Sequence, residues 1–176
     1  PLDAIARGLA LIPEDRRGQG IALSMPVYEN IALPILSRFV SRFGLMKSLL
    51  VQHANKLINQ LNIRTPGPLT AAGSLSGGNQ QKVVLAKWLS TDARVFLFDE
   101  PTQGVDVGAK DEIYALINLL AAQGRTVLIV SSDLEEVLTI GHRVLAMRSG
   151  RIVAEFAGGA ISAGPIVEAI TQGSQS

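Results

Sequence analysis

Short, uninterrupted apolar runs alternate along this chain with stretches whose apolar residues recur at helical spacing. The runs at 95–98 and 126–130 are rich in β-branched or aromatic residues, which favours buried strands. Between them lies a helical stripe that stops at Gly124 and consists of Ile113, Leu116, Ile117 and Leu120. Strand, helix and strand in this order predict parallel βαβ units and therefore an α/β fold.

The same patterns place further elements on either side of this unit. We expect a strand at 10–12, helices at about 50–61, 76–90 and 134–140, and a hairpin that joins 144–147 to 152–156. The Gly- and Ser-rich tail at 157–176 is expected to pack loosely.

Composition narrows the classes of protein to which this chain can belong. Of its 176 residues, 47% are hydrophobic and 18% are charged, which suits a globular chain with a sizeable core. The chain has no cysteine, which excludes disulfides and thiolate metal sites. Its net charge of +1, with scattered basic residues, argues against binding nucleic acid. No apolar stretch reaches the roughly 18–20 residues that span a bilayer. Because the first residue is Pro1, we expect the chain to begin inside a longer protein.

A glycine-rich run at 74–82, Ser-Leu-Ser-Gly-Gly-Asn-Gln-Gln-Lys, opens the helix expected at 76–90. Backbone N–H groups at the start of a helix attract anions, so Ser76, Gly77 and Gly78 are candidates for binding phosphate. Gly77 stands where we expect the backbone to approach the ligand closely, because a side chain there would intrude. The alternative is that the Ser76 hydroxyl only caps the helix, a role that serine often takes.

Two carboxylates, Asp99 and Glu100, follow the apolar run at 95–98. Open α/β sheets bind ligands beyond the carboxyl ends of their strands, so both acids fall where chemistry is expected. Asp99 suits Mg²⁺, which prefers oxygen ligands, and Glu100 suits a general base that orients an attacking water. The alternative is that these acids only cap the next turn. No Gly-x-x-x-x-Gly-Lys-Ser/Thr phosphate loop occurs in the 176 residues.

These motifs, in this order and spacing, resemble those of the ATP-binding cassette (ABC) family. The run Leu75–Lys82 resembles the signature motif, Phe96–Thr102 resembles the Walker B strand with its glutamate, and Gly104–Asp106 resembles the D-loop. The resemblance extends over about residues 8–156. It implies a partial ABC-type nucleotide-binding domain at 1–156 with a C-terminal β-hairpin. Within it, the resemblance implies a helical subdomain at about 26–90 and a RecA-like parallel βαβ core at about 91–156.

Three further runs narrow the subfamily. The extension Asn-Gln-Gln-Lys at 79–82, the run Pro-Glu-Asp-Arg at 13–16 and the pair Ser131-Ser132 resemble the second nucleotide-binding half of importers for ribose, xylose, galactose or autoinducer-2. Such proteins carry two cassettes in one polypeptide. The resemblance implies hydrolysis of ATP with Mg²⁺ to energise import of a small sugar through membrane permease subunits, with a periplasmic sugar-binding protein as an indirect partner. It also implies a peripheral location at the cytoplasmic face of the bacterial inner membrane.

The resemblance further implies a role for each candidate residue. Glu100 is expected to be the general base, and Asp99 and Glu14 are expected near Mg²⁺. The residues expected to bind the ATP that the opposite cassette holds are Ser76, Gly77, Gly78 and Gln80. Asp106 is expected at the junction of the two cassettes, although the residues alone also allow it to cap the helix beginning near Gly108.

Two positions depart from the general family pattern. Glu14 stands at the glutamine of the Q-loop, and an ionised carboxylate cannot donate a hydrogen bond. Ser132 stands at the catalytic switch histidine, where a hydroxyl cannot act as a cation. Because Ser132 and Glu135 also fit a capping box, we expect Ser132 to cap the helix at 134–140. Arg16 and Arg17 are expected in a solvated loop, and the alternative is that they contact nucleotide or a partner.

Two other functions stay open on the sequence. Without a phosphate loop, the chain could be an inactive truncated cassette that serves only as a binding or interaction module. A cassette ATPase acting in DNA repair or translation is a further alternative, which the near-neutral charge and the run at 79–82 disfavour. A phosphate loop upstream of Pro1 would discriminate between the enzyme and the inactive module.

Overall fold

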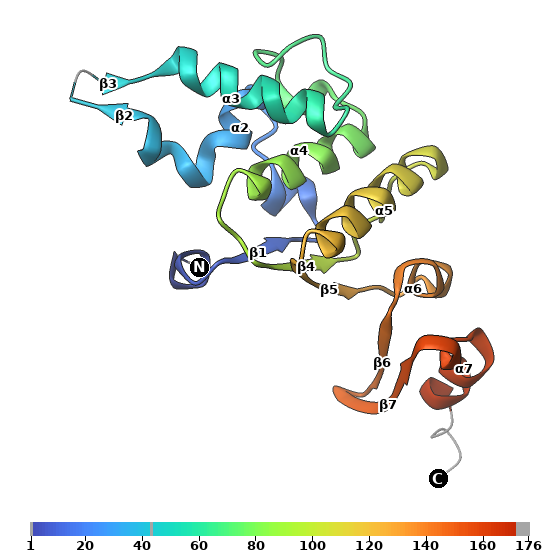
Figure 1. Ribbon diagram of the computed structural model, residues 1–176. Helices are drawn as coiled ribbons and strands as arrows, with labels where there is room; N and C mark the ends of the chain where they lie inside the picture. Colours follow the sequence, from blue (N-terminus) through green and yellow to red (C-terminus); the bar gives the residue numbers. More distant parts are fainter. Residues whose placement is uncertain (1, 43, 172–176) are drawn as a thin grey trace. The chain divides into compact units, whose positions relative to one another are not determined.

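The computed structural model describes residues 2–42 and 44–171 (Figure 1). The chain divides into two compact units, residues 1–130 and residues 131–176. The glycine-rich run and the acidic strand end both belong to the first unit, whereas Ser132 belongs to the second. The domain boundary expected between 156 and 157 falls inside the second unit.

A three-stranded parallel sheet forms the centre of the first unit. Its strand order is β1 (Leu9–Ile12), β4 (Val95–Asp99) and β5 (Thr126–Val130). In register, Ile12 lies beside Phe98, and Phe98 lies beside Ile129. Helix α5 (Val107–Ala122) connects β4 to β5, so the predicted parallel βαβ unit is confirmed. All three strands run in one direction, and the loops after β1 and β4 therefore leave the same edge of the sheet.

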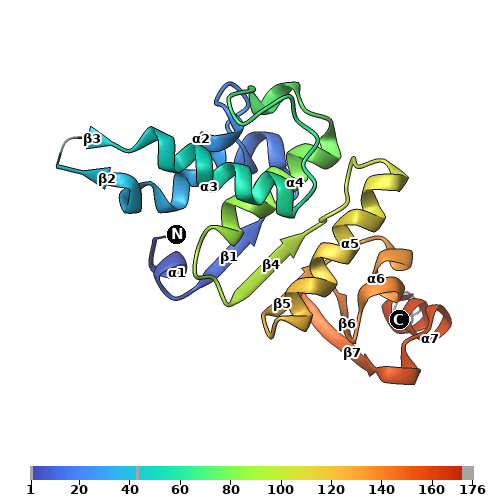
Figure 2. The same cartoon turned by 45° about the horizontal axis from the view of Figure 1, so that its top comes forward.

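The two faces of this sheet differ in exposure. On one face Ala10, Ile12, Phe96 and Phe98 are almost completely buried, and the rings of Phe96 and Phe98 stack with centroids 6.5 Å apart. Helix α4 (Gly77–Leu89) packs on β1, and α5 packs on β5 (Figure 2). The other face stays apolar and open, because Leu11 and Leu128, both register neighbours of Leu97, are 49% and 52% exposed.

The helical part of the first unit consists of α4 and the helices that precede it in the sequence. Helices α2 (Val27–Ala32), α3 (Lys47–Gln60) and α4 pack together. The stripe predicted on α3 is confirmed, since Leu50, Ala54, Leu57 and Ile58 are buried. The remaining short elements of this unit are α1 (Leu2–Ala6), the π-helical turn η1 (Arg16–Gly20), the 3-10 segments η2 (Leu33–Phe39) and η3 (Ala72–Ser74), and the strand pair β2 (Val40–Ser41) and β3 (Gly44–Leu45).

The second unit consists of α6 (Leu134–Ile140), the antiparallel hairpin of β6 (Arg143–Arg148) and β7 (Arg151–Ala157), η4 (Gly158–Ala160) and α7 (Ala163–Thr171). The predicted hairpin is confirmed, with Ser149 and Gly150 at positive φ in its turn. The segment expected to pack loosely instead forms η4 and α7. Helix α7 packs on both strands through a buried Ile166, and the guanidinium of Arg148 donates to the carbonyl of Ala169 at 3.3 Å. Residues 172–176 of that segment lie outside the described residues.

Among the helices of the described ranges, none combines the length and apolar character that crossing a bilayer requires.

Candidate functional site

The glycine-rich run becomes the first turn of α4. Ser76 occupies the N-cap position with extended backbone, but its side chain makes no capping bond to the helix. Its hydroxyl instead accepts a hydrogen bond from the Asn79 side-chain amide at 2.9 Å. The alternative in which the Ser76 side chain serves as the cap is therefore wrong. Because the first N–H groups of a helix have no intrahelical partner, the turn keeps donors that suit an anion.

Two glycines in this turn are required by close approach of neighbouring segments. A Cβ on Gly78 would lie 2.6 Å from the Cβ of Ala109 on α5. A Cβ on Gly77 would lie 2.8 Å from Nη2 of Arg16 and 3.0 Å from the carbonyl oxygen of Gly104. The sequence predicts that the glycine at 77 leaves space for a ligand. In the structure, the space is needed for Arg16 and the loop after β4.

Gln80 belongs to the same helix but is completely buried. Its side-chain amide donates to the carbonyl of Leu75 at 3.0 Å, and its Oε1 accepts from Nε of Arg17 at 3.4 Å. A side chain enclosed in this way orders the turn that leads into α4. The direct nucleotide contact predicted for Gln80 does not agree with this burial, because the amide points into the protein.

The two candidate acids lie at the carboxyl edge of the sheet. Asp99 is the last residue of β4 and pairs with Val130, and the N–H of Glu100 donates to the carbonyl of Val130 at 2.9 Å. Glu100 has a φ of +46°, in the left-handed region. Its side chain is half-buried. Non-glycine residues rarely adopt this conformation, and it recurs where a functional side chain has to be aimed.

Glu14 leaves the same edge one strand away. Glu14 lies two residues beyond Ile12, and Glu100 lies two residues beyond Phe98. Ile12 and Phe98 are partners in the register of β1 and β4. Glu14 is exposed, whereas Asp99 and Glu100 are half-buried. Over residues 2–42 and 44–171, no three acidic, histidine or cysteine side chains converge into a complete metal site. A hard cation held here would take a carboxylate and fill its other positions with water or phosphate oxygens, as Mg²⁺ commonly does.

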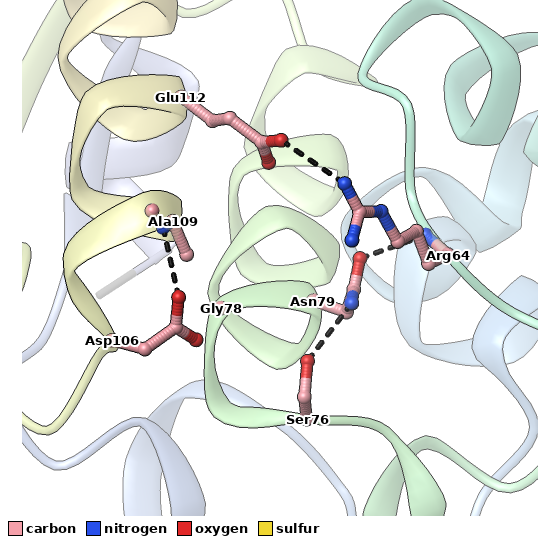
Figure 3. Close-up of a pocket in the computed structure, with 8 residues that line it drawn as sticks. Arg64, Ser76, Gly78, Asn79, Asp106, Ala109 and Glu112 are labelled. Carbon is pink, nitrogen blue, oxygen red and sulfur yellow. Dashed lines mark hydrogen bonds and ion pairs between the residues drawn. The ribbon is translucent and has the colours of Figure 1, made fainter.

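Asp106 is the N-cap of α5, and its Oδ1 accepts a hydrogen bond from the N–H of Ala109 at 3.0 Å. The capping role that the residues alone allowed is thus confirmed. Figure 3 shows how the first turns of α4 and α5 face each other across a pocket of about 170 Å³. The residues that line it are Arg64, Ser76, Gly78, Asn79, Asp106, Gly108, Ala109 and Glu112.

Comparison with known proteins identifies the family. A family model described as ABC transporter matches residues 5–103, which is more than half of the chain. The chain belongs to the ABC transporter family. Within the family, it is 46% identical over 89% of its length to a ribose import ATP-binding protein of Rhodopirellula baltica. It is 48% identical over 88% of its length to a xylose import ATP-binding protein of Moorella thermoacetica.

The chain spans 30% of the length of each of these two ABC relatives. A solved dimeric ATP-binding cassette in a post-hydrolysis state has the same fold, with a TM-score of 0.72 and 22% sequence identity. That match covers 89% of this chain and 66% of the solved one. The ABC-type fold expected from the motifs is therefore confirmed, together with a nucleotide-binding family.

Sequence reasoning missed a charged network that joins the ABC signature helix to α5. Lys82 is buried on α4, and its ammonium donates to the carbonyl of Asn62 at 3.0 Å and to Oε2 of Glu112 at 2.5 Å. Arg64 reaches the other oxygen of Glu112 at 3.6 Å, and its N–H donates to Oδ1 of Asn79 at 2.7 Å. The hydrogen bond from Lys82 is the main cause that lowers the pKa of Glu112, with a further contribution from the charge of Arg64. The one feature of the sequence that could have indicated this network is Lys82, because it directly precedes the apolar run at 83–86.

Sequence reasoning also missed the contacts of Arg16, which is half-buried although its neighbours Asp15 and Arg17 are exposed. Its Nη1 donates to the carbonyl of Gln103 at 2.7 Å, and its Nη2 donates to the carbonyl of Gly104 at 3.1 Å. Partial burial is the main cause that lowers the pKa of Arg16, and the charge of Arg17 acts in the same direction. Arg16 thus connects the loop after β1 to the loop resembling the ABC D-loop.

Ser132, which the resemblance leads us to expect at the position of the family's switch histidine, is exposed in the second unit. The cap of α6 is Asp133, whose Oδ1 accepts from the N–H groups of Glu135 at 3.0 Å and Glu136 at 3.3 Å. The prediction that Ser132 caps this helix is wrong, because the residue after it takes that place. Serine and aspartate are both favoured N-caps, so the sequence pattern placed the cap one residue too early.

Proposed function

We propose that this chain is part of an ATP-hydrolysing cassette that energises import of ribose, xylose or a related small sugar. The family, and the names of relatives at 46% and 48% identity, support a sugar importer. The observation that carries the hydrolytic role is the backbone of Glu100. A glutamate at φ +46°, fixed by the carbonyl of Val130, is strained at the sheet edge where open α/β folds bind ligands.

In this proposal the acids divide the chemistry between them. Glu100 takes a proton from, and orients, the water that attacks the γ-phosphate, since a half-buried carboxylate at a fixed strand end can act as a general base. Asp99 holds Mg²⁺ directly or through water, and Glu14 reaches the ion from the neighbouring strand. When bound, Mg²⁺ neutralises charge on the transferred phosphate. The shared edge of β1 and β4 supports this set of ligands.

The first turn of α4 is proposed to act on a different nucleotide, one that a second cassette holds. Ser76 is exposed and leaves the first N–H groups of α4 uncapped by its side chain, which suits phosphate oxygens. Gly77 and Gly78 contribute backbone N–H groups to the same phosphate. Asp106 contributes at the junction while capping α5. Ser132, in the place of the switch histidine, stays a candidate for the chemistry of this half's own site and not for the nucleotide of the second cassette.

Permease subunits are the proposed membrane partners, reached from the cytoplasmic face of the inner membrane. Support comes from apolar side chains that the helical part exposes around η2 and the β2–β3 pair, namely Leu33, Leu36, Val40 and Leu45. Such side chains suit a protein partner better than solvent. The near-neutral charge of the chain gives no footprint for nucleic acid.

Substitution of Glu100 by glutamine in the protein that carries this chain tests the hydrolytic role. Glutamine keeps the shape but loses basicity, so kcat for ATP hydrolysis at this site should fall about 100-fold or more while ATP binding persists. Glu135→Gln is the matched control, because Glu135 is an exposed glutamate on α6. An unchanged single-site kcat in E100Q removes Glu100 from the mechanism.

A further inference from the structure

The turn that carries Arg16 is anchored on α4. Asp15 closes the turn by accepting the N–H of Gly18 at 2.9 Å. Gly20, at its end, is buried, and a Cβ there would lie 3.1 Å from Cγ2 of Val84. The ammonium of Lys87 donates to the carbonyl of Gly20 at 2.5 Å. The backbone of Arg16 is therefore fixed to the body of the signature helix.

From this anchored turn, the Arg16 side chain reaches a loop 87 residues away in sequence. Its two terminal nitrogens donate to the consecutive carbonyls of Gln103 and Gly104. The same guanidinium touches the start of α4, since a Cβ on Gly77 would lie 2.8 Å from Nη2. Three segments meet at one cation: the loop after β1, the loop after β4 and the first turn of α4.

The contacts of Arg16 indicate that it positions neighbouring segments and does not serve mainly as one half of an ion pair. Both carbonyls are neutral acceptors, and its buried Nε has no hydrogen-bond partner among the described residues. A partly buried cation without a paired carboxylate contributes little to stability, because its desolvation offsets its hydrogen bonds. Hydrogen bonds from a cation are nevertheless strong individually, and a fork onto two successive carbonyls fixes the direction of the loop.

We propose that Arg16 is a positioning residue that fixes the loop at 100–106 relative to the first turn of α4. This proposal rests on the proposed function, because the loop begins at the general base Glu100 and ends at Asp106. The loop holds the base of one site, and the first turn of α4 holds the phosphate donors for the other. Because Arg16 connects the loop at 100–106 to the first turn of α4, these two segments move together. Each site is therefore complete only when both segments are in place.

The test uses the protein that carries this chain and measures hydrogen exchange and ATP hydrolysis on the same variants. Arg16→Met removes the fork and should raise exchange in peptides spanning 100–110 about tenfold or more, as expected for loss of charge-assisted bonds. It should also lower kcat about tenfold or more while KM for ATP changes less. Arg16→Lys retains a single ammonium donor, so its exchange and kcat should lie between those of R16M and those of the wild type. This variant also serves as the test if R16M fails to fold. Arg7→Met, at an exposed arginine just after α1, is the control for lost charge.

Unchanged exchange at 100–110 in R16M overturns the proposal whatever the activity, and if R16M does not fold, unchanged exchange in R16K does so. Raised exchange with an unchanged kcat overturns the link to the reaction. Failure of the proposed function has a different signature, namely E100Q that hydrolyses ATP like the wild type. Because exchange is measured without turnover, that result and a failure of the Arg16 proposal can be told apart.

Discussion

The ion pair between Lys82 and Glu112 allows a sharp test of how the signature helix is held on α5. The side chain of Lys82 is 3% exposed, whereas that of Glu112 is 42% exposed. Removing the two partners should therefore have unequal costs. Glu112→Ala leaves a buried ammonium with only one of its two acceptors, the carbonyl of Asn62. Lys82→Met keeps the buried aliphatic volume and returns an accessible carboxylate to water.

The magnitudes follow from this asymmetry. Breaking a fully buried pair costs about 3–5 kcal/mol, and leaving one buried donor unsatisfied costs about 1–3 kcal/mol. Water reaches Glu112, so E112A should cost about 2–3 kcal/mol of unfolding free energy. K82M should cost about 1 kcal/mol or less, as for a partly exposed pair. In the double variant no charge is stranded, and its cost should be smaller than the sum by about 1–2 kcal/mol.

Urea unfolding at neutral pH can measure these values through the fluorescence of Trp88. Trp88 is the single tryptophan of the chain and lies on the same helix as Lys82. Glu155→Ala is the matched control, because its partner Arg143 lies on an exposed surface and the pair should contribute little. The reasoning fails if E112A costs no more than K82M, or if the two costs add within about 0.5 kcal/mol in the double variant.

The same pair predicts a pH dependence. The hydrogen bond from Lys82 holds the folded-state pKa of Glu112 below the ordinary value of 4.5. Glu112 therefore contributes stability that is fully present above that value. As pH falls below about 4.5 towards the lower folded-state pKa, the unfolded chain binds the proton first and the contribution is lost. The difference in unfolding free energy between wild type and Glu112→Gln should therefore shrink with acidification. A difference that grows below this pH would contradict the direction of the shift.

Two further predictions concern the second unit and the signature turn. Asp133→Ala should cost about 1 kcal/mol of stability by circular dichroism melting, because two N–H groups of α6 lose their acceptor, while Ser132→Ala should cost less; equal losses would return the capping role to Ser132. Ser76→Glu places a negative charge at an exposed turn, so it should leave the fold intact and stop hydrolysis of nucleotide held by the other cassette. Site-resolved photolabelling with an ATP analogue reports this outcome, and an effect confined to the site on its own half would refute action in trans.

Local pattern was sufficient to predict most of the fold. The strands at 95–99 and 126–130 and the helix between them follow from periodicity and a stop at Gly124. The candidate acids could be found because a strand end carries them in consecutive positions. At the tail, glycines and serines around 158–164 outweighed a short apolar pattern, and α7 was missed.

Contacts between distant segments could not be predicted in the same way. Arg16 finds its acceptors at Gln103 and Gly104, and Lys82 finds Glu112 on another helix. In the sequence both are basic residues, one in a polar loop and one beside an apolar run, with nothing local to indicate a partner. The burial of Gln80 has the same origin, because the turn before α4 closes over it only in the folded chain. Residue type restricts such contacts, but the topology decides them.

The left-handed backbone at Glu100 has a consequence for how this chain tolerates change. Glycine or asparagine adopts a φ of +46° more easily than glutamate does, so either would relieve strain at this position. A library selected for thermal tolerance alone would therefore drift towards replacing the carboxylate. Resistance to heat and retention of the acid are opposed at this residue, and the glutamate persists only under selection for what its side chain does.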